Sequence, residues 1–242
     1  MAKSTTVESQ ARAAVASLRR LAKKEIRDGM ARYGLPCDNA FGVSVGNIQT
    51  LAKQFGRDHE LALALWDRGW YEARMLATFV DEPARVTPAQ MDRWCRDFDN
   101  WGICDTVCFH LFDRTPHAFA KISKWADRKR EFEKRAAFAL LASVALHDKK
   151  PADAPFRESL ELIARAATDE RNFVKKGVSW ALRGIGKRNA QLRAAAIELA
   201  ERLAESSSAA ARWVGNDTLR DLLRPAKAKA RSRRATTAPR LR

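Results

Sequence analysis

The sequence predicts an all-α protein, and three observations support this fold class. Apolar residues recur at helical spacing along most of the chain. Glycine and proline are few, at 11 and 8 of 242 residues, and no run alternates β-branched and polar residues as a strand would. The hydrophobic content of 46% is sufficient for a large core. We therefore expect a folded protein made of helices, without a sheet.

Turn-forming segments divide the chain into predicted helices of about 10 to 18 residues. These segments are residues 34–39, 81–88, 113–117, 147–155, 168–172, 186–189 and 205–208. The two ends of the chain lack a clear helical pattern, and the last 18 residues also lack acidic residues. The sequence thus predicts a disordered N-terminus (1–8), a single helical domain (9–224) and a disordered basic tail (225–242).

A basic residue recurs at a similar position in successive predicted helices. It is Arg74 in YEARMLA, Arg135 in FEKRAAFALLA, Lys176 in FVKKGVSWALR and Arg212 in AAARWVG. The intervals of 61, 41 and 36 residues fit repeats of about 30 to 45 residues if the first spans two units, with WGICDTVC as the missing one. This predicts HEAT-like helix pairs stacked into a curved α-solenoid with a basic concave groove. A chance alignment in a chain rich in alanine and arginine is the alternative.

The charge balance indicates a polyanionic partner. The net charge is +16, and the tail carries seven of these positive charges, so the folded part is basic by itself. Nucleic acid or an anionic membrane surface fits this excess, and a solvated basic surface without a partner is the alternative.

No export or membrane segment is evident. The longest uncharged apolar run, residues 136–146, is shorter than the roughly 20 residues of a membrane span, and Glu8 and Arg12 interrupt the N-terminus. We expect a monomer in the cytoplasm, associated with the nucleoid if the protein is bacterial. The four cysteines are expected to be reduced, because no export signal is evident. Cys104 and Cys108 are expected to be buried thiols, since no recognisable set of metal ligands accompanies them. We expect neither a metal nor a cofactor.

The predicted helix at residues 172–187 has two distinct faces. One face is apolar, and the other carries Lys176, Trp180, Arg183 and Lys187. Three cations along about 16 Å of helix can follow phosphates, and the indole can contact a sugar or a base. Alternatively, the indole packs against the neighbouring repeat beneath ordinary surface cations.

Asp105 is a carboxylate among residues typical of a buried helix. Asp99 and Asn100 predict the start of this helix, and Trp101 lies one turn before Asp105 on the same face. If that face joins Arg135 and Trp180, the groove suits a cationic ligand attached to a polyanion. An aromatic face attracts a cation by about 0.5 to 2 kcal/mol. A carboxylate about 4 Å from a positive centre gains about 4 kcal/mol at an effective dielectric constant near 20. Alternatively, Asp105 is a buried acid paired with a neighbouring arginine.

The segment GVSVG at residues 42–46 matches the GxSxG motif of serine hydrolases. That motif requires a strand before the serine and an α/β sheet around it, whereas LPCDNAF precedes it here in a helical chain. We therefore do not expect a serine nucleophile.

The succession WGICD, FEKRAAFALL and FVKKGVSWALRGIGKRN resembles the AlkD family of DNA alkylation repair glycosylases, from about residue 41 to residue 223. The resemblance implies a HEAT-like enzyme whose partner is alkylated double-stranded DNA. Such a monofunctional glycosylase would excise positively charged alkylpurines, chiefly 3-methyladenine and 7-methylguanine, by hydrolysing the N-glycosidic bond without flipping the base. A non-catalytic HEAT-like scaffold that binds nucleic acid or protein is the alternative.

Matched motif by motif, the resemblance also implies roles for individual residues. Asp105 would stabilise the oxocarbenium-like sugar and position a water. Trp101 and Trp180 would embrace the deoxyribose, and Arg135 would hold a phosphate. The chain departs from the family at Gly102, where an aspartate is frequent. The residues expected to bind DNA are Lys176, Arg183, Lys187, Arg74, Arg212 and, in the FGVS segment, Ser44.

Overall fold

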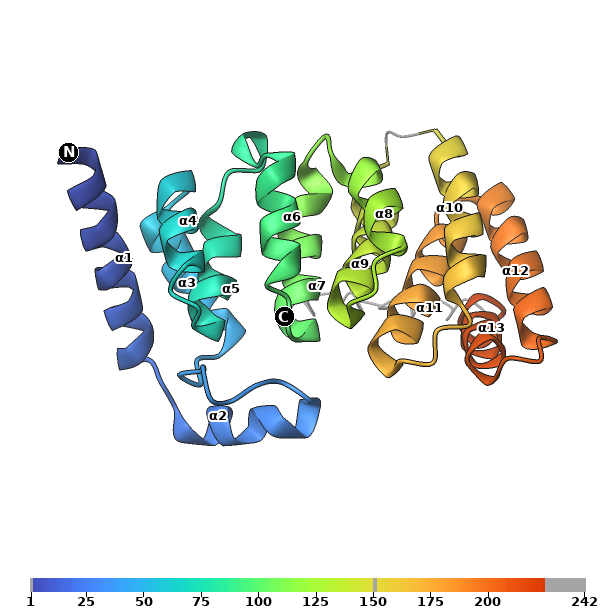
Figure 1. Ribbon diagram of the computed structural model, residues 1–242, viewed down its shortest axis with the longest axis horizontal. Helices are drawn as coiled ribbons and strands as arrows, with labels where there is room; N and C mark the ends of the chain where they lie inside the picture. Colours follow the sequence, from blue (N-terminus) through green and yellow to red (C-terminus); the bar gives the residue numbers. More distant parts are fainter. Residues whose placement is uncertain (1, 150–151, 225–242) are drawn as a thin grey trace, which may run out of the picture.

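The computed structural model describes residues 2–149 and 152–224, and within these ranges it consists of helices and connecting segments (Figure 1). The basic tail, for which the sequence predicts disorder, lies outside the described residues. The absence of strands from the described ranges agrees with the all-α prediction.

The helices form two layers of an elongated stack, which runs from α1 at one end to α12 and α13 at the other (Figure 1). The first layer contains α1 (Ala2–Arg20), α4 (His59–Trp66), α6 (Pro88–Arg96), α8 (Ala118–Ala126), α10 (Ala154–Ala166) and α12 (Ala190–Ala204). The second contains α3 (Val45–Phe55), α5 (Tyr71–Val80), α7 (Trp101–His110), α9 (Glu131–His147), α11 (Asn172–Gly186) and α13 (Ala209–Leu222). The short elements are α2 (Lys24–Met30), η1 (Ala31–Tyr33), η2 (Pro83–Arg85) and η3 (Phe112–Arg114).

Each helix of the second layer packs against its predecessor, from α3 and α5 through to α11 and α13. Helices α4 and α5, α8 and α9, α10 and α11, and α12 and α13 also pack as consecutive pairs. This arrangement confirms the predicted solenoid of helix pairs. Turns at residues 56–58, 67–70, 97–100 and 127–130 separate further helices. The sequence analysis predicted only the helix start that follows the third of these turns.

The start of α7 agrees with its predicted cap. The side-chain oxygen of Asn100 accepts a hydrogen bond from the backbone N–H of Ile103 at 2.9 Å. This bond satisfies one of the amide groups that a helix start leaves without an intrahelical partner. The cap therefore fixes where α7 begins, and with it the position of Asp105 one turn later.

The predicted disorder of residues 1–8 is wrong for residues 2–8, because α1 begins at Ala2. Two contacts explain the difference. Ala11, Ala14 and Leu18 are fully buried on one face of α1. The Glu8 carboxylate also accepts a hydrogen bond from Arg68 at 2.5 Å. Tertiary packing therefore stabilises a helix whose first residues lack a clear helical signal.

The core of the first half contains stacked tryptophans. The rings of Trp66 and Trp94 lie 3.9 Å apart and nearly parallel, at 4°. The indole N–H of Trp66 donates to the Asp97 carboxylate at 2.8 Å, and that of Trp125 donates to Asp92 at 2.8 Å. These bonds let large aromatic side chains be buried without losing their polar contacts.

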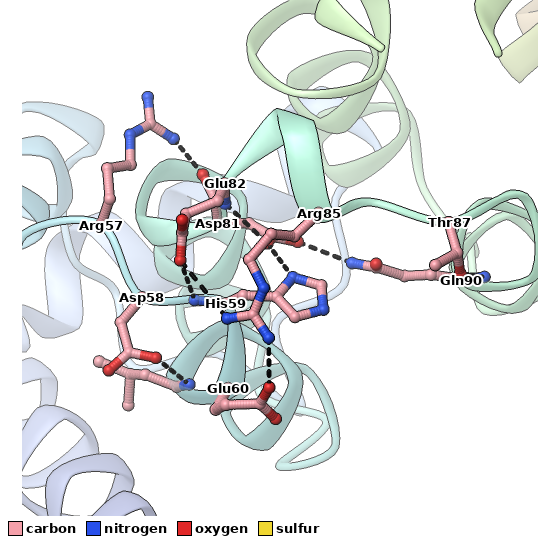
Figure 2. A network of polar contacts seen from close by, with 10 residues as sticks. Arg57, Asp58, His59, Glu60, Asp81, Glu82, Arg85, Thr87 and Gln90 are labelled. Atoms are coloured by element: carbon pink, nitrogen blue, oxygen red, sulfur yellow. Dashed lines mark hydrogen bonds and ion pairs between the residues drawn. The ribbon is translucent and has the colours of Figure 1, made fainter. Parts of the chain in front are cut away.

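A buried carboxylate links α4, α5 and α6 (Figure 2). Asp81 pairs with His59 Nδ1 at 2.6 Å and accepts hydrogen bonds from the Gln90 side chain at 2.7 Å and the Glu82 backbone N–H at 2.8 Å. Burial raises the pKa of the Asp81 carboxyl, and His59 opposes this rise. On the exposed side of the same network, Arg85 pairs with Glu60 at 2.7 Å.

We expect Asp81→Ala to lower the free energy of unfolding by about 3 to 5 kcal/mol, because it leaves buried partners unsatisfied. Glu60→Ala is the matched control from the same network, and its cost should stay below about 1 kcal/mol because that ion pair is exposed. Urea unfolding measures both values. Equal costs for the two variants would contradict a structural role for the buried network.

Candidate active site

A bidentate ion pair joins α7 to α9. Arg135 Nε donates to Asp105 Oδ1 at 2.9 Å, and Nη2 donates to Oδ2 at 2.6 Å. The third donor of the guanidinium, Nη1, bonds to the backbone oxygen of Phe173 on α11 at 2.6 Å. The Arg135 side chain is 8% exposed and that of Asp105 is 19% exposed. Arg135 therefore pairs with the carboxylate from the buried side, while part of the Asp105 side chain remains exposed to solvent.

Burial and pairing act on Asp105 in opposite directions. Burial raises the pKa of its carboxyl above the ordinary value, and the charge and hydrogen bonds of Arg135 oppose that rise. The pKa of Arg135 is raised, because Asp105 outweighs the effect of burial on the guanidinium. Loss of either residue would therefore change the pKa of the other.

Asp105 lies in the wall of a surface hollow of about 540 Å³. Helix α7 contributes this acid, α9 contributes mainly apolar side chains, and α11 contributes an indole and two cations. The residues that line the hollow are Asp105, Ala142, Ala145, Leu146, Lys149, Trp180, Arg183, Gly184 and Lys187. The structure thus brings together Asp105, Trp180, Arg183 and Lys187, four residues that the sequence analysis selected.

Small residues bring α9 and α11 close to each other. A Cβ added at Gly177 would lie 3.5 Å from side-chain atoms of Arg135 and Phe138, and one at Gly184 would lie 3.4 Å from the Ala142 backbone. These close approaches let α11 pack tightly against α9. Trp180 lies one turn from each glycine, so the packing places its indole beside the hollow.

Phe109 is a neighbour of the site that the sequence analysis missed. It lies one turn after Asp105 on α7, and its ring stacks with that of Trp180 at 6.4 Å and 23°. Trp180 is half-buried: it packs against the hydrophobic core and also lines the hollow. The spacing Trp101, Asp105, Phe109 was a sequence signal for this contact.

The predicted cations of α11 differ in their partners. Arg183 lies 3.7 Å from the Asp217 carboxylate, and Lys187 lies 2.5 Å from that of Asp221, both on α13. Both pairs are partly open to solvent, so a phosphate can compete with the two carboxylates for these cations. Lys176 is exposed and does not line the hollow.

Three other residues that were expected to bind DNA make local contacts instead of lining the hollow. Arg74 donates to the Asp97 backbone oxygen at 3.2 Å and lies over the Trp66 ring. Arg212 donates to the backbone oxygens of the Ser206–Ser207 turn. Ser44 caps α3, accepting from the Asn47 backbone N–H at 3.4 Å.

Trp101 stands at the first position of α7, one turn before Asp105. It is half-buried, and its indole N–H donates to the Tyr33 backbone oxygen at 2.7 Å. This bond fixes the indole against η1. Trp101 does not line the hollow around Asp105.

The thiols of α7 point into the protein. Cys104 and Cys108 are fully buried and donate to the backbone oxygens of Phe132 and Ala136 on α9. Burial raises the pKa of Cys108 well above the ordinary value.

In the described part of the chain, no group of three or more histidine, cysteine or acidic residues could hold a metal ion. No helix within the described ranges has the length and apolar character required to cross a membrane.

The fold is similar to that of a solved structure described as "A new family of proteins related to the HEAT-like repeat DNA glycosylases with affinity for branched DNA structures". The TM-score is 0.72, the sequence identity is 18%, and the match covers 88% of this chain and 95% of the other. The protein therefore shares the HEAT-like repeat fold of this structure. A search of curated proteins finds no match.

The family model described as "DNA alkylation repair enzyme" matches residues 14–221. The chain belongs to this family.

The departure at Gly102 has a structural consequence. A Cβ at this position would lie 2.5 Å from the Tyr71 hydroxyl and 3.0 Å from Leu35 Cδ2. Burial raises the pKa of Tyr71 to about 12, as expected for a phenol held in an apolar contact. The first turn of α7 therefore packs directly on the start of α5.

We expect Gly102→Ala to lower the free energy of unfolding by about 1 to 3 kcal/mol through overpacking. Tyr71→Phe removes the closest atom, so the double variant should recover part of that loss. Chemical denaturation of the two single variants and the double variant gives the coupling energy. Additive costs would show that the hydroxyl does not limit this position.

Proposed function

We propose that the protein is a monofunctional DNA glycosylase that excises positively charged alkylpurines, chiefly 3-methyladenine and 7-methylguanine, from duplex DNA without flipping the base. The observation that carries the proposal is an ion-paired carboxylate in the wall of a hollow that also contains an indole and three cations. Membership of the DNA alkylation repair enzyme family supports the same activity.

Asp105 is suited to stabilise a developing positive charge. A carboxylate has about four lone-pair positions, and Arg135 occupies one on each oxygen, which leaves others for a water or the sugar. A base that already carries positive charge leaves without a general acid. The remaining work is to stabilise the oxocarbenium-like sugar and to orient a water, and a partly buried carboxylate strengthens both interactions.

Arg135 is better suited to position Asp105 than to bind a phosphate, which revises the role expected from the resemblance. Its side chain is 8% exposed, and all three of its hydrogen bonds go to protein groups. In this proposal, Trp180 contacts the deoxyribose of the damaged nucleotide from the wall of the hollow. Trp101 would contact the same sugar from the start of α7.

Arg183, Lys187 and Lys149 would hold the DNA backbone at the rim of the same hollow. Two of these cations have acidic partners on α13 that a phosphate can replace. Lys176 would extend the contact beyond the hollow.

A second candidate is a DNA-binding scaffold without catalysis. The bidentate pairing of Asp105 favours it, because a carboxylate held by an arginine can serve structure alone. The structural neighbour described as having affinity for branched DNA supports a binding role for this fold.

We expect Asp105→Asn to lower base excision by about 100-fold or more, because charge stabilisation of the transition state is lost. Duplex affinity should remain within about threefold, since the substitution removes no phosphate contact. The measurement is release of free 3-methyladenine and 7-methylguanine from methylated duplex DNA, corrected for spontaneous loss.

Asp92→Asn is the matched control, because it also removes a partly buried, ion-paired carboxylate but lies on α6, outside the hollow. It should keep nearly full excision. Normal release by Asp105→Asn would refute the role of the acid. Absence of release by the wild-type protein, with salt-dependent DNA binding intact, would establish the scaffold instead.

The rate of excision should also depend on pH. Catalysis requires the ionised form of Asp105, so the excision rate should fall as the pH falls through its pKa. Because Arg135 counteracts the effect of burial on that pKa, Arg135→Gln should raise it and move the loss of activity to higher pH. The pH profile of single-turnover excision measures this, with thermal unfolding to confirm that each variant is folded.

An unchanged pH profile combined with weaker DNA binding would instead assign Arg135 to a phosphate, as the resemblance implied.

A further inference from the structure

A second basic hollow lies between the C-terminal half of α1 and the turn that joins α4 to α5. Its volume is about 290 Å³, and it is lined by Arg12, Val15, Ala16, Arg19, Arg68 and Trp70. Three guanidinium groups therefore surround a small space with an indole at one side. None of these residues was selected in the sequence analysis.

An aromatic pair supports one of the guanidinium groups. Phe41 and Trp70 stack with their centroids 4.5 Å apart. The Arg19 guanidinium lies 5.6 Å from the first ring and 5.9 Å from the second. Among the described residues, the Arg19 side chain has no ion pair or hydrogen-bond partner; its ring contacts are those to Phe41 and Trp70. A guanidinium held over aromatic rings keeps its N–H groups free for a bidentate contact with phosphate.

The aromatic pair is held from beneath by a buried acid. The Glu72 carboxylate, 1% exposed, accepts hydrogen bonds from the backbone N–H groups of Phe41, Gly42 and Val43 at 2.9, 2.7 and 3.1 Å. Gly42 has a φ of +85°, and a Cβ there would collide with the Lys23 backbone oxygen, so the turn requires glycine. Phe41 is therefore fixed beside Trp70 before any ligand binds.

Acids around this hollow are too few to neutralise it. Glu8 pairs with Arg68 at 2.5 Å and lies 4.0 Å from Arg12, which leaves Arg19 without an acidic partner. The chain from residue 12 to residue 32 contains seven lysine and arginine residues and only Glu25 and Asp28 as acids. The local excess of positive charge favours a polyanion over a neutral ligand.

A direct chain of contacts connects this hollow to the active site. Trp70 precedes Tyr71, whose hydroxyl group packs against Gly102 at the start of α7. Asp105 lies less than one turn beyond Gly102. The two hollows are thus joined by neighbouring helices of the second layer, α5 and α7 (Figure 1).

We propose that this hollow is a second phosphate site, which binds the backbone of DNA away from the damaged nucleotide. Arg19 donates to the phosphate, Arg12 and Arg68 add positive charge, and the apolar surface of Val15 and Trp70 contacts the adjoining deoxyribose. The phosphate belongs to the duplex that occupies the active site, or to a second arm of branched DNA. This proposal rests on the DNA binding of the proposed function, but it does not depend on excision of the base.

The test compares Arg19→Ala with Arg20→Ala. Arg20 is the matched control, because it is the adjacent exposed arginine, makes a hydrogen bond to Ser17 and does not line this hollow. Both variants lose one positive charge. Affinity for long duplex DNA and for a three-way junction is measured by fluorescence anisotropy over a range of salt concentrations.

We expect Arg19→Ala to weaken binding by about 5- to 10-fold and to reduce the slope of log K against log salt by about one unit. Arg20→Ala should leave the slope nearly unchanged. A loss with the long duplex assigns the phosphate to the duplex in the active site, and a loss with the junction alone assigns it to a second arm. Equal behaviour of the two variants on both DNAs would overturn the proposal.

Excision by Arg20→Ala, a residue that lines neither hollow, should match the wild type in a single turnover at saturating DNA. The binding measurement stands even if the wild-type protein releases no base, so failure of this site and failure of the proposed glycosylase activity are distinguishable.

Discussion

The ion pair between Asp105 and Arg135 is the contact on which the candidate active site depends. It joins α7 to α9, and the remaining donor of Arg135 extends the link to α11. Removing a carboxylate and a guanidinium from water is costly, and only close, well-directed hydrogen bonds compensate for that cost. The bidentate geometry supplies these bonds and still leaves Asp105 at the surface. One arginine thus fixes the acid and the spacing of three helices.

The packing around this pair determines what else reaches the hollow. Gly177 and Gly184 let α11 approach α9 closely, so Trp180 lies beside Asp105 and stacks on Phe109. The cations of α11 lie at the rim and share the acids of α13. A positively charged nucleotide in DNA would meet a carboxylate and an aromatic ring, while its phosphates would meet cations. In the function that we propose, the arrangement would separate recognition of the lesion from attraction to the backbone.

Sequence reasoning succeeded where helical spacing alone decides the outcome, and it failed where two distant segments must meet. The cap at Asn100 and the shared face of Trp180, Arg183 and Lys187 follow from residues within one helix. Arg74 follows the same basic pattern, yet it contacts Asp97 and Trp66 because of how α5 packs. Disorder was predicted for residues 1–8; the contact of Glu8 with Arg68 spans 60 positions in the chain and leaves no local signal in the sequence.

The sequence by itself determined the all-α class, the paired-helix repeat and the basic character of the protein, because periodicity and charge are local properties. It also selected Asp105 and Arg135 but left open whether the acid would face a ligand or an arginine. Only the tertiary structure decided that Asp105 pairs with Arg135 and also lines a surface hollow, since this depends on the separation of α7, α9 and α11. The second hollow at Arg19 arises in the same way, from an α1 side chain placed over Phe41 and Trp70.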